Sequence, residues 1–228
     1  YIGQQGPGGT PFPMIKNIYI TEKDELVVVC NLNEGYEVFW FGTDNLKKYS
    51  VVINPQTIPQ LSKDETDEKF VSICNVIPDL NEDKLYISVD YYENSIDEDS
   101  KLQSGIDYIQ TLLYTLDCKK ETYDETVSVP PYEESVVVDY SKLNYKIPYE
   151  FMGATKNGWK YFILKTQDGF NIEMIQNESQ KILRRHFVAD HENNLFYNMY
   201  LSPDGIITSN GSAIFSNDEL IYGVEIPK

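Results

Sequence analysis

The chain has few of the residue types that build metal centres and disulfide frameworks. Only 3 of its 228 residues are cysteine and only 2 are histidine. Cys30, Cys74 and Cys118 lie far apart, and neither a CxxC pair nor a zinc-type Cys/His spacing occurs. This odd, scattered set excludes a disulfide framework, while a single bridge, and with it the redox compartment, stays open. We interpret Cys30 and Cys74 as small buried hydrophobic residues, whereas Cys118 lies in a turn that can expose it.

Long apolar runs and long helical patterns are also missing. No stretch of about eighteen consecutive apolar residues is present, so the sequence predicts no membrane span. The chain opens at Tyr1 without a methionine, and no basic and apolar segments of the signal-peptide type follow. We therefore expect a processed or trimmed product, with any export signal or lipid-attachment cysteine lying upstream.

Positive charge is scarce as well. The chain has 19 Lys plus Arg against 36 Asp plus Glu, which makes a formal net charge of -17. Such a surface repels phosphate backbones, so nucleic acid is excluded as an expected partner. The same field favours cations or basic patches on protein partners.

Strand-forming and turn-forming residues are abundant instead. The chain contains 18 Tyr, 10 Phe, 13 Gly and 11 Pro, a mixture that favours strands joined by tight turns. Four times a short apolar run leads through a polar turn into a second apolar run, starting at Met14, Val71, Tyr149 and Leu195. Such self-similarity is typical of repeat architectures, whose units bury their apolar faces against their neighbours. The sequence therefore predicts an all-β propeller with about four blades of four-stranded antiparallel meander.

The first repeat is the clearest, because alternation and turn residues predict four strands at 15–20, 26–30, 37–41 and 47–53. We interpret the whole chain, 1–228, as a single propeller domain with blades at about 14–53, 71–129, 149–187 and 195–226. The polar run 93–107 is interpreted as a loop insertion in the second blade, and the proline-flanked stretch 130–148 as a linker.

The run YIGQQGPGGTPFPMIKNIYITEKDELVVVCNLNEGYEVFWF, from Tyr1 to Phe41, resembles an NHL-type β-propeller repeat. The turn SPDG at Ser202 is similar to turns of WD40-like propellers. Together with SKLQSGIDY and DGFNIEMIQ, the N-terminal run resembles a family of uncharacterised spirochaete propeller lipoproteins. This resemblance spans most of the chain. It implies a ring of six to eight blades in the periplasm or cell envelope of a bacterium, tethered through an upstream lipid anchor, and it carries over no activity. Four blades alone do not close such a ring, which then requires further sequence or a partner.

Two clusters are weak candidates for a metal site. His186, Asp190 and His191 combine imidazole and carboxylate groups at short spacing, which suits a divalent cation or proton transfer. If the strand here runs straight, however, His186 and His191 point to opposite faces. Asp97 and Asp99 belong to the densest acidic group, but their spacing lacks the alternating oxygen ligands of a calcium loop. A structural or solvated role is the simpler interpretation of both clusters.

Nothing in the sequence indicates a cofactor or a catalytic centre. The glycines between Gly3 and Gly9 are followed by Thr10 and Pro11 rather than by the Lys-Ser or Lys-Thr of a phosphate loop. No nucleophile elbow and no HExxH motif occur. Trp40 and Trp159 indicate packing between blades rather than a ligand cage. We therefore expect no enzyme and no cofactor.

Three functions follow as hypotheses. The favoured one is a non-enzymatic binding or scaffold module that presents loops to protein partners. Its contact candidates lie in the expected insertion and are Ile96, Asp97, Asp99, Leu102 and Gln103. The alternatives are a propeller enzyme, or a small-ligand or cation-binding protein, that uses the central channel near His186, and a structural subunit that completes a ring with another chain or with a copy of itself.

Overall fold

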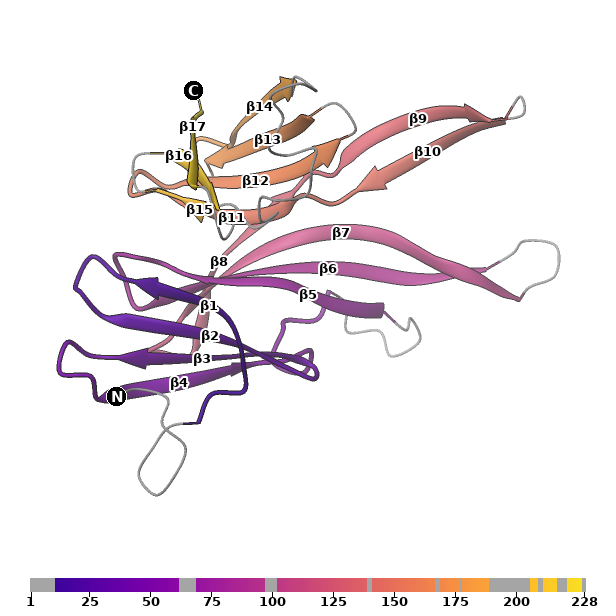
Figure 1. Ribbon diagram of the computed structural model, residues 1–228. Coiled ribbons are helices and arrows are strands. Elements are labelled where there is room, and N and C mark those ends of the chain that lie inside the picture. The colour runs from indigo at the N-terminus through magenta and orange to yellow at the C-terminus, as the bar shows by residue number, and fades with distance from the viewer. Residues whose placement is uncertain are drawn as a thin grey trace. The chain divides into compact units, whose positions relative to one another are not determined.

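A computed structural model describes residues 11–61, 69–96, 102–138, 141–166, 169–176, 178–188, 206–208, 211–216 and 221–226 (Figure 1). These residues contain no helix, so none of them forms a helical membrane span. Their strands form antiparallel sheets, which confirms the predicted all-β class. The chain divides into two compact units, 1–126 and 127–228, where the sequence predicts one domain.

Unit 1 contains two four-stranded antiparallel sheets, each a meander in which consecutive strands pair. The first sheet consists of β1 (Met14–Ile20), β2 (Leu26–Leu32), β3 (Gly35–Phe41) and β4 (Lys47–Ile53). The second consists of β5 (Lys69–Pro78), β6 (Lys84–Ile96), β7 (Gln103–Asp117) and β8 (Thr122–Val129). The four strands predicted for the first repeat are confirmed within one or two residues at each end.

Unit 2 contains a third four-stranded meander, a two-stranded hairpin and a three-stranded sheet. The meander consists of β11 (Glu150–Ala154), β12 (Trp159–Thr166), β13 (Gly169–Gln176) and β14 (Lys181–Val188). The hairpin pairs β9 (Tyr132–Val138) with β10 (Ser141–Ile147). The three-stranded sheet consists of β15 (Ile206–Ile207), β16 (Ser212–Ser216) and β17 (Ile221–Glu225).

The sheets repeat in detail. In each four-stranded meander the first strand carries a β-bulge against the second, at Lys16, Cys74 and Met152. A bulge adds one residue and increases the local twist of the strand. Three meanders with the same strand order and the same bulge have the construction of propeller blades, which agrees with the predicted fold class.

The turn between the first two strands also recurs. It begins at Thr21, Thr155 and Thr208, whose backbone N–H groups donate to the carbonyl oxygen four residues later at 2.9 Å in each case. The fourth residue of each turn has a positive φ: Asp24 (57°), Gly158 (78°) and Gly211 (90°). The shared turn shows that β15 corresponds to the first strand of a blade.

Both faces of the first sheet are buried. Val28 and Phe39 pack on one face, while Val27 and Trp40 lie on the other, and none of the four is more than 4% exposed. A central strand buried on both faces has a continuous apolar sequence, and residues 26–30 of β2 form such an apolar run. In the third meander, Tyr161 and Ile172 belong to a core that also includes residues of β15 and β16.

The two sheets of unit 1 are joined by specific hydrogen bonds. The hydroxyl of Tyr36 donates to the carbonyl oxygen of Cys74 at 3.1 Å, and the ammonium of Lys16 lies 3.1 Å from the amide oxygen of Asn75. The N–H of Glu22 donates to the carbonyl oxygen of Leu80 at 2.7 Å. These bonds satisfy polar groups of adjacent sheets.

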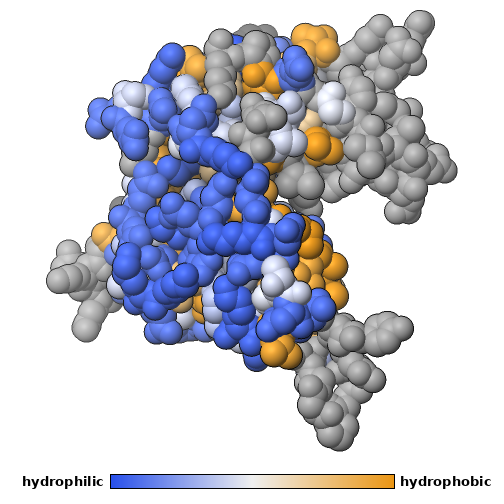
Figure 2. All heavy atoms as spheres, turned by 90° about the vertical axis from the view of Figure 1, so that its left-hand side faces the viewer, coloured by the Kyte–Doolittle hydropathy of each residue, from blue (hydrophilic) through white to orange (hydrophobic). Residues whose placement is uncertain are grey.

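A buried carboxylate connects the turns at one end of unit 1. Asp83, whose side chain is 7% exposed, lies 2.6 Å from Lys119, 3.5 Å from Lys23 and 4.0 Å from Lys48. Burial opposes its ionisation, but the hydrogen bond from Lys119 and the three lysine charges outweigh burial, so the pKa of Asp83 is lowered. In the view of Figure 2, most of the described residues in sight are hydrophilic, with hydrophobic ones between them. We call Asp83 together with Lys23, Lys48 and Lys119 the lysine-capped carboxylate.

Two segments differ from the expectation. Most of the expected loop insertion 93–107 is strand, because β6 continues to Ile96 and β7 begins at Gln103. The expected linker 130–148 is the hairpin β9–β10. In both segments cross-strand pairing accommodates polar residues, since a two-stranded ribbon exposes its side chains to water on both faces. The predictions of a loop insertion and of a linker, which depend on charge and proline content, are therefore wrong for the described residues that form these strands.

The cysteines are free thiols. Cys30 is buried, as predicted, and Cys118, in the turn that can expose it, is only 8% exposed. Cys74 is partly buried. Burial is the largest cause that raises the pKa of the Cys118 thiol to about 12, with the charges of Asp83 and Asp117 adding to it. The first part of the predicted blade 195–226, residues 195–205 with the SPDG turn, lies outside the described residues.

Candidate functional site

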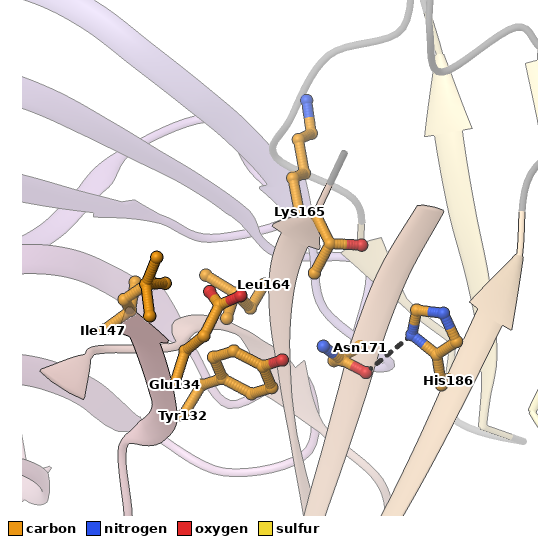
Figure 3. A pocket seen from close by; sticks show the side chains of 9 residues that line it. Tyr132, Glu134, Ile147, Leu164, Lys165, Asn171 and His186 are labelled. Carbon is orange, nitrogen blue, oxygen red and sulfur yellow. Dashed lines mark hydrogen bonds between the residues drawn. The ribbon is translucent and has the colours of Figure 1, made fainter. Parts of the chain in front are cut away.

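Unit 2 contains an open pocket between the hairpin β9–β10 and one face of the meander β11–β14 (Figure 3). Its volume is about 1160 Å³. The hairpin supplies aromatic, acidic and aliphatic side chains, and the meander supplies one leucine and several polar residues. The lining residues are Tyr132, Glu134, Val136, Ile147, Leu164, Lys165, Thr166, Asn171 and His186.

Strand pairing explains why the hairpin residues share a face. Tyr132, Glu134 and Val136 alternate along β9, and side chains at every second position point to the same side of a strand. Ile147 lies directly opposite Tyr132 on β10. The hairpin therefore presents one mixed face to the pocket.

The meander contributes a cross-strand row. Leu164 on β12 pairs with Asn171 on β13, and Asn171 pairs with His186 on β14. Directly opposed residues in antiparallel strands lie on the same face, so the three side chains stand side by side. Lys165 and Thr166 complete the pocket where β12 ends.

His186 and Asn171 form a hydrogen bond. Nδ1 of His186 lies 2.9 Å from Oδ1 of Asn171. Since an amide oxygen only accepts, the imidazole donates to it through Nδ1–H. Figure 3 shows the amide nitrogen of Asn171 turned toward the side of the pocket where Tyr132 and Leu164 lie. The pair thus holds both an amide donor and an imidazole in fixed orientations.

The next row on this face is an ion pair. Glu173 and Arg184 pair across β13 and β14, with Oε2 of Glu173 2.6 Å from Nε of Arg184. Glu173 is fully buried, and its Oε1 has no hydrogen-bond partner among the described residues. Burial raises the pKa of Glu173 although Arg184 opposes the shift. The pKa of Tyr149 is about 12, because of burial first and then of the Glu173 charge.

Unit 1 contains a second candidate, an extension of the β6–β7 hairpin. Among the described residues, β5 pairs with β6 as far as Glu93, and beyond that residue β6 and β7 pair with each other. An amide of Gln103 donates to Asn94 at 2.6 Å and ties the two strands together. The extension is therefore an ordered projection, not a loop, along its described length.

One face of this projection carries most of its apolar side chains, and Asn94 and Gln103 lie on the same face opposite Ile106 and Ile96. Pairing places Phe70, Tyr92 and Tyr108 in one cross-strand row, and Ile106 and Ile96 follow on the same face. The rings of Tyr92 and Tyr108 meet edge to face at 5.9 Å. Phe70, Ile106 and Ile96 are 39%, 57% and 61% exposed. We call these five residues the apolar stripe.

The opposite face of the projection is charged. Lys69, Glu93 and Asp107 lie in one cross-strand row. Glu93 and Asp107 are directly opposed carboxylates, a pair that repels, and Lys69 beside Glu93 offsets part of the repulsion. The two faces of the same ribbon thus have different chemistry.

The structure separates the residues named from the sequence. His186 lines the pocket, whereas its expected partners Asp190 and His191 lie outside the described residues. Ile96 and Gln103 lie on the projection, and Leu102, 68% exposed, precedes β7. Asp97 and Asp99 lie outside the described residues. Within the part of the chain that the structure describes, no group of three or more His, Cys, Asp and Glu is placed to hold a metal ion.

The sequence did not single out Tyr132, Glu134 or Asn171. These residues come together only because the stretch 130–148 folds as a hairpin beside the meander. The alternation in YEESVVV and the facing alternation in SKLNYKI are the signals that can identify such a hairpin.

Trp40 and Trp159, for which the sequence predicts a packing role, are buried, with exposed fractions of 0% and 7%.

No model of a known protein family matches this chain, and no curated protein matches it. The resemblance to NHL-type repeats and to spirochaete lipoproteins therefore stays a prediction. The functional argument depends on the geometry of the two sites.

Proposed function

We propose that this chain is a non-enzymatic propeller module that binds a protein partner through the projection of β6 and β7. The observation that carries the proposal is the apolar stripe, whose two isoleucines at the end of the ribbon are each more than half exposed. Exposed apolar side chains that lie contiguously are typical of interaction surfaces, while scattered ones are normal. The envelope location and the upstream lipid anchor belong to this proposal and are supported by the sequence resemblance.

The partner chemistry follows from both faces of the projection. The stripe calls for an apolar groove, because its rings and isoleucines lose water on contact. The opposite face and the sequence between β6 and β7, Asp97 to Lys101, are mainly acidic. A groove rimmed by lysine or arginine therefore suits the projection, and salt is expected to slow association.

The double variant Ile96→Asn/Ile106→Asn tests the proposal. Both side chains are exposed, so the unfolding free energy is expected to change by about 0.5 kcal/mol or less. The wild-type chain, immobilised and exposed to extract of the source organism, is expected to retain a protein that the double variant loses. With that partner purified, calorimetry should show at least roughly tenfold weaker binding by the variant.

Leu46→Asn is the matched control, because Leu46 is 67% exposed in the same unit but lies in the β3–β4 turn away from the stripe. Its retained proteins should equal those of the wild type. Identical capture by the wild type and the double variant would contradict the proposal. Light scattering on the same two proteins identifies a second copy of the chain as the partner if only the wild type dimerises, and that result supports the structural-subunit form of the function.

A further inference from the structure

β14 is the last strand of the third meander, and one of its edges carries a separate inference (Figure 1). All 8 of its residues pair with β13 on one side, and no strand pairs with its other edge among the described residues. Such an edge presents a row of backbone N–H and C=O groups to which an extended segment can add. We propose that β14 binds an extended peptide of another protein, in which acidic and apolar residues alternate.

The charge of β14 differs from that of the whole chain. Its sequence, KILRRHFV, contains Lys181, Arg184 and Arg185, among them both arginines of the chain, and it contains no acidic residue. The chain as a whole carries a net charge of -17. Because salt limits electrostatic attraction to about 8 Å at physiological ionic strength, the charges beside the edge decide which strand it accepts. A strand that carries carboxylates is therefore favoured there.

Arg184 is oriented for a second carboxylate. Its Nε lies 2.6 Å from Oε2 of the buried Glu173, and its side chain is 54% exposed. Within the part of the chain that the structure describes, this is the one hydrogen bond that the guanidinium makes, so its terminal nitrogens are left for a ligand. A planar guanidinium binds a carboxylate through two parallel N–H groups. Because Glu173 fixes the guanidinium before a ligand arrives, binding costs less side-chain entropy.

The two faces of β14 explain why acidic and apolar residues should alternate in the peptide. Arg184 and Val188 belong to the exposed face, while Leu183 and Phe187, on the other face, pack against the core of the third meander. Residues directly opposite each other in paired strands share a face. An added strand therefore places one set of alternate residues beside Arg184 and the other set beside Leu183 and Phe187. Acidic residues suit the first set, and apolar residues suit the second.

Binding is tested with three synthetic decapeptides on the full chain. The first alternates glutamate and valine, the second has a block of glutamates followed by a block of valines, and the third alternates lysine and valine. We expect the first to bind with an affinity that falls as salt is added, and the other two to bind at least roughly tenfold more weakly. The second peptide has the composition of the first without its alternation, so it separates strand pairing from attraction by charge alone.

Substitutions of Val188 link the binding to this edge. Val188 is 73% exposed and shares a face with Arg184, so a charge there changes the attraction with little effect on folding. Val188→Lys should strengthen binding of the glutamate–valine peptide and Val188→Glu should weaken it, with a difference of roughly tenfold between the two variants at low salt. Val137→Glu is the matched control, because Val137 is 71% exposed in the same unit but lies on β9, and this variant should bind as the wild type does.

The contribution of Arg184 is measured in a background that keeps unit 2 folded. Arg184→Ala combined with Glu173→Gln removes the cation without leaving a buried charge. This double variant should bind the glutamate–valine peptide at least roughly tenfold more weakly than Glu173→Gln alone.

Hydrogen exchange of the β14 amides identifies what occupies the edge. About half of the amides of an edge strand point away from its neighbour, and these should exchange fast in the free protein and slowly with the glutamate–valine peptide bound. Slow exchange in the free monomer would show that the chain itself covers this edge. Slow exchange only at high protein concentration would show that a second copy does. Either result overturns the proposal.

Three binding results also overturn it: the glutamate–valine peptide does not bind, all three peptides bind equally, or Val188→Lys and Val188→Glu bind equally. The proposal does not depend on the protein-binding role of the β6–β7 projection, because the two sites share no residue. The Ile96→Asn/Ile106→Asn variant should therefore bind the peptide normally. Loss of peptide binding with an intact projection partner, or the reverse, shows which of the two proposals has failed.

Discussion

Each compact unit buries a carboxylate, and the two carboxylates are stabilised differently. Asp83 in unit 1 lies under three lysines whose side chains are 34% to 68% exposed. Glu173 in unit 2 is fully buried and has one cation, Arg184, on one of its oxygens. The pKa of Asp83 is lowered, while the pKa of Glu173 is raised. Nearby positive charge outweighs burial in the first case, and burial outweighs it in the second.

The difference indicates a structural role for Asp83 and a position beside a candidate binding site for Glu173. The lysine-capped carboxylate joins the turns of two sheets and contributes to the stability of unit 1 at neutral pH. Glu173 costs stability in its charged form, and it lies one row away from the pocket residues Asn171 and His186. Costly buried charges are often kept beside binding sites. The two tryptophans, Trp40 in unit 1 and Trp159 in unit 2, allow each unit to be followed separately.

The largest expected effect is that of Arg184→Ala. It leaves Glu173 as a buried charge without its cation, so unit 2 is expected to lose about 3 kcal/mol of unfolding free energy. Adding Glu173→Gln should restore a large part, because the buried charge is then gone. Urea unfolding of both variants in a Trp40→Phe background measures the effect on unit 2. Equal stabilities of the single and double variants would show that the pair is not coupled.

A smaller loss is expected for Asp83→Ala. The lysines remain hydrated when their shared carboxylate is removed, so unit 1 should lose about 2 kcal/mol. The control is Glu82→Ala, since Glu82 pairs with Lys84 at 2.7 Å but is 60% exposed, and about 0.5 kcal/mol or less is expected there. Unfolding followed by Trp40 in a Trp159→Phe background makes the comparison. A loss of unfolding free energy no larger than that of Glu82→Ala would show that the lysine-capped carboxylate does not stabilise unit 1.

The pH dependence of the two sites should have opposite signs. The folded-state pKa of Asp83 is lowered, so its stabilisation is present above its ordinary value of about 4 and is lost as the pH falls through the lower folded value. The folded-state pKa of Glu173 is raised, so its contribution is complete below about pH 4 and is lost as the pH rises through the raised value.

Paired variants isolate these contributions from the other carboxylates. From pH 7 down toward pH 4, the wild type should gain stability relative to Glu173→Gln. Over the same range the advantage of the wild type over Asp83→Asn should stay constant and shrink only below about pH 4. Denaturant unfolding at pH 3, 4, 5 and 7 provides the values. Parallel curves for the two variants would contradict the assigned directions.

The smallest expected effect is on thiol reactivity. The raised pKa of Cys118, about 12, and its burial predict negligible reaction with a disulfide reagent at pH 8 in the folded protein. Asp83→Ala removes one of the charges that raise this pKa and should speed the reaction of Cys118. Mass spectrometry of labelled peptides gives the rate for each thiol. Fast labelling of Cys118 in the folded wild type would show that its turn opens readily.

The strands of the meanders were predictable because they carry local signals. The run Leu26 to Cys30 is apolar throughout, and turns such as that after Ala154 contain glycine where a positive φ is needed. At Gly35, with a φ of 109°, any Cβ would collide with the carbonyl oxygen of Ile53, so glycine is required for the β2–β3 turn. Such constraints act over a few residues and remain visible in one sequence.

The sites were less predictable, because they depend on pairing over longer distances. The short spacing of His186 to Asp190 and His191 is visible in the sequence, but its partner Asn171 lies 15 residues away on β13 and carries no local signal. The hairpin β9–β10 and the β6–β7 projection looked like a linker and a loop, since their polar residues resemble those of surface segments. Only pairing reveals that Tyr132 and Ile147, or Asn94 and Ile106, share a face.

The sequence by itself determined the all-β class, the meanders and the burial of Trp40 and Trp159, since alternation, turn chemistry and apolar content act locally. Only the tertiary structure decided that lysines stabilise the charge of Asp83 and that burial destabilises the charge of Glu173. It also brought together the residues of the pocket and of the apolar stripe. The physical reason is that strand register converts residues far apart in the chain into neighbours on one face, and a shift of one residue would send each side chain to the opposite side.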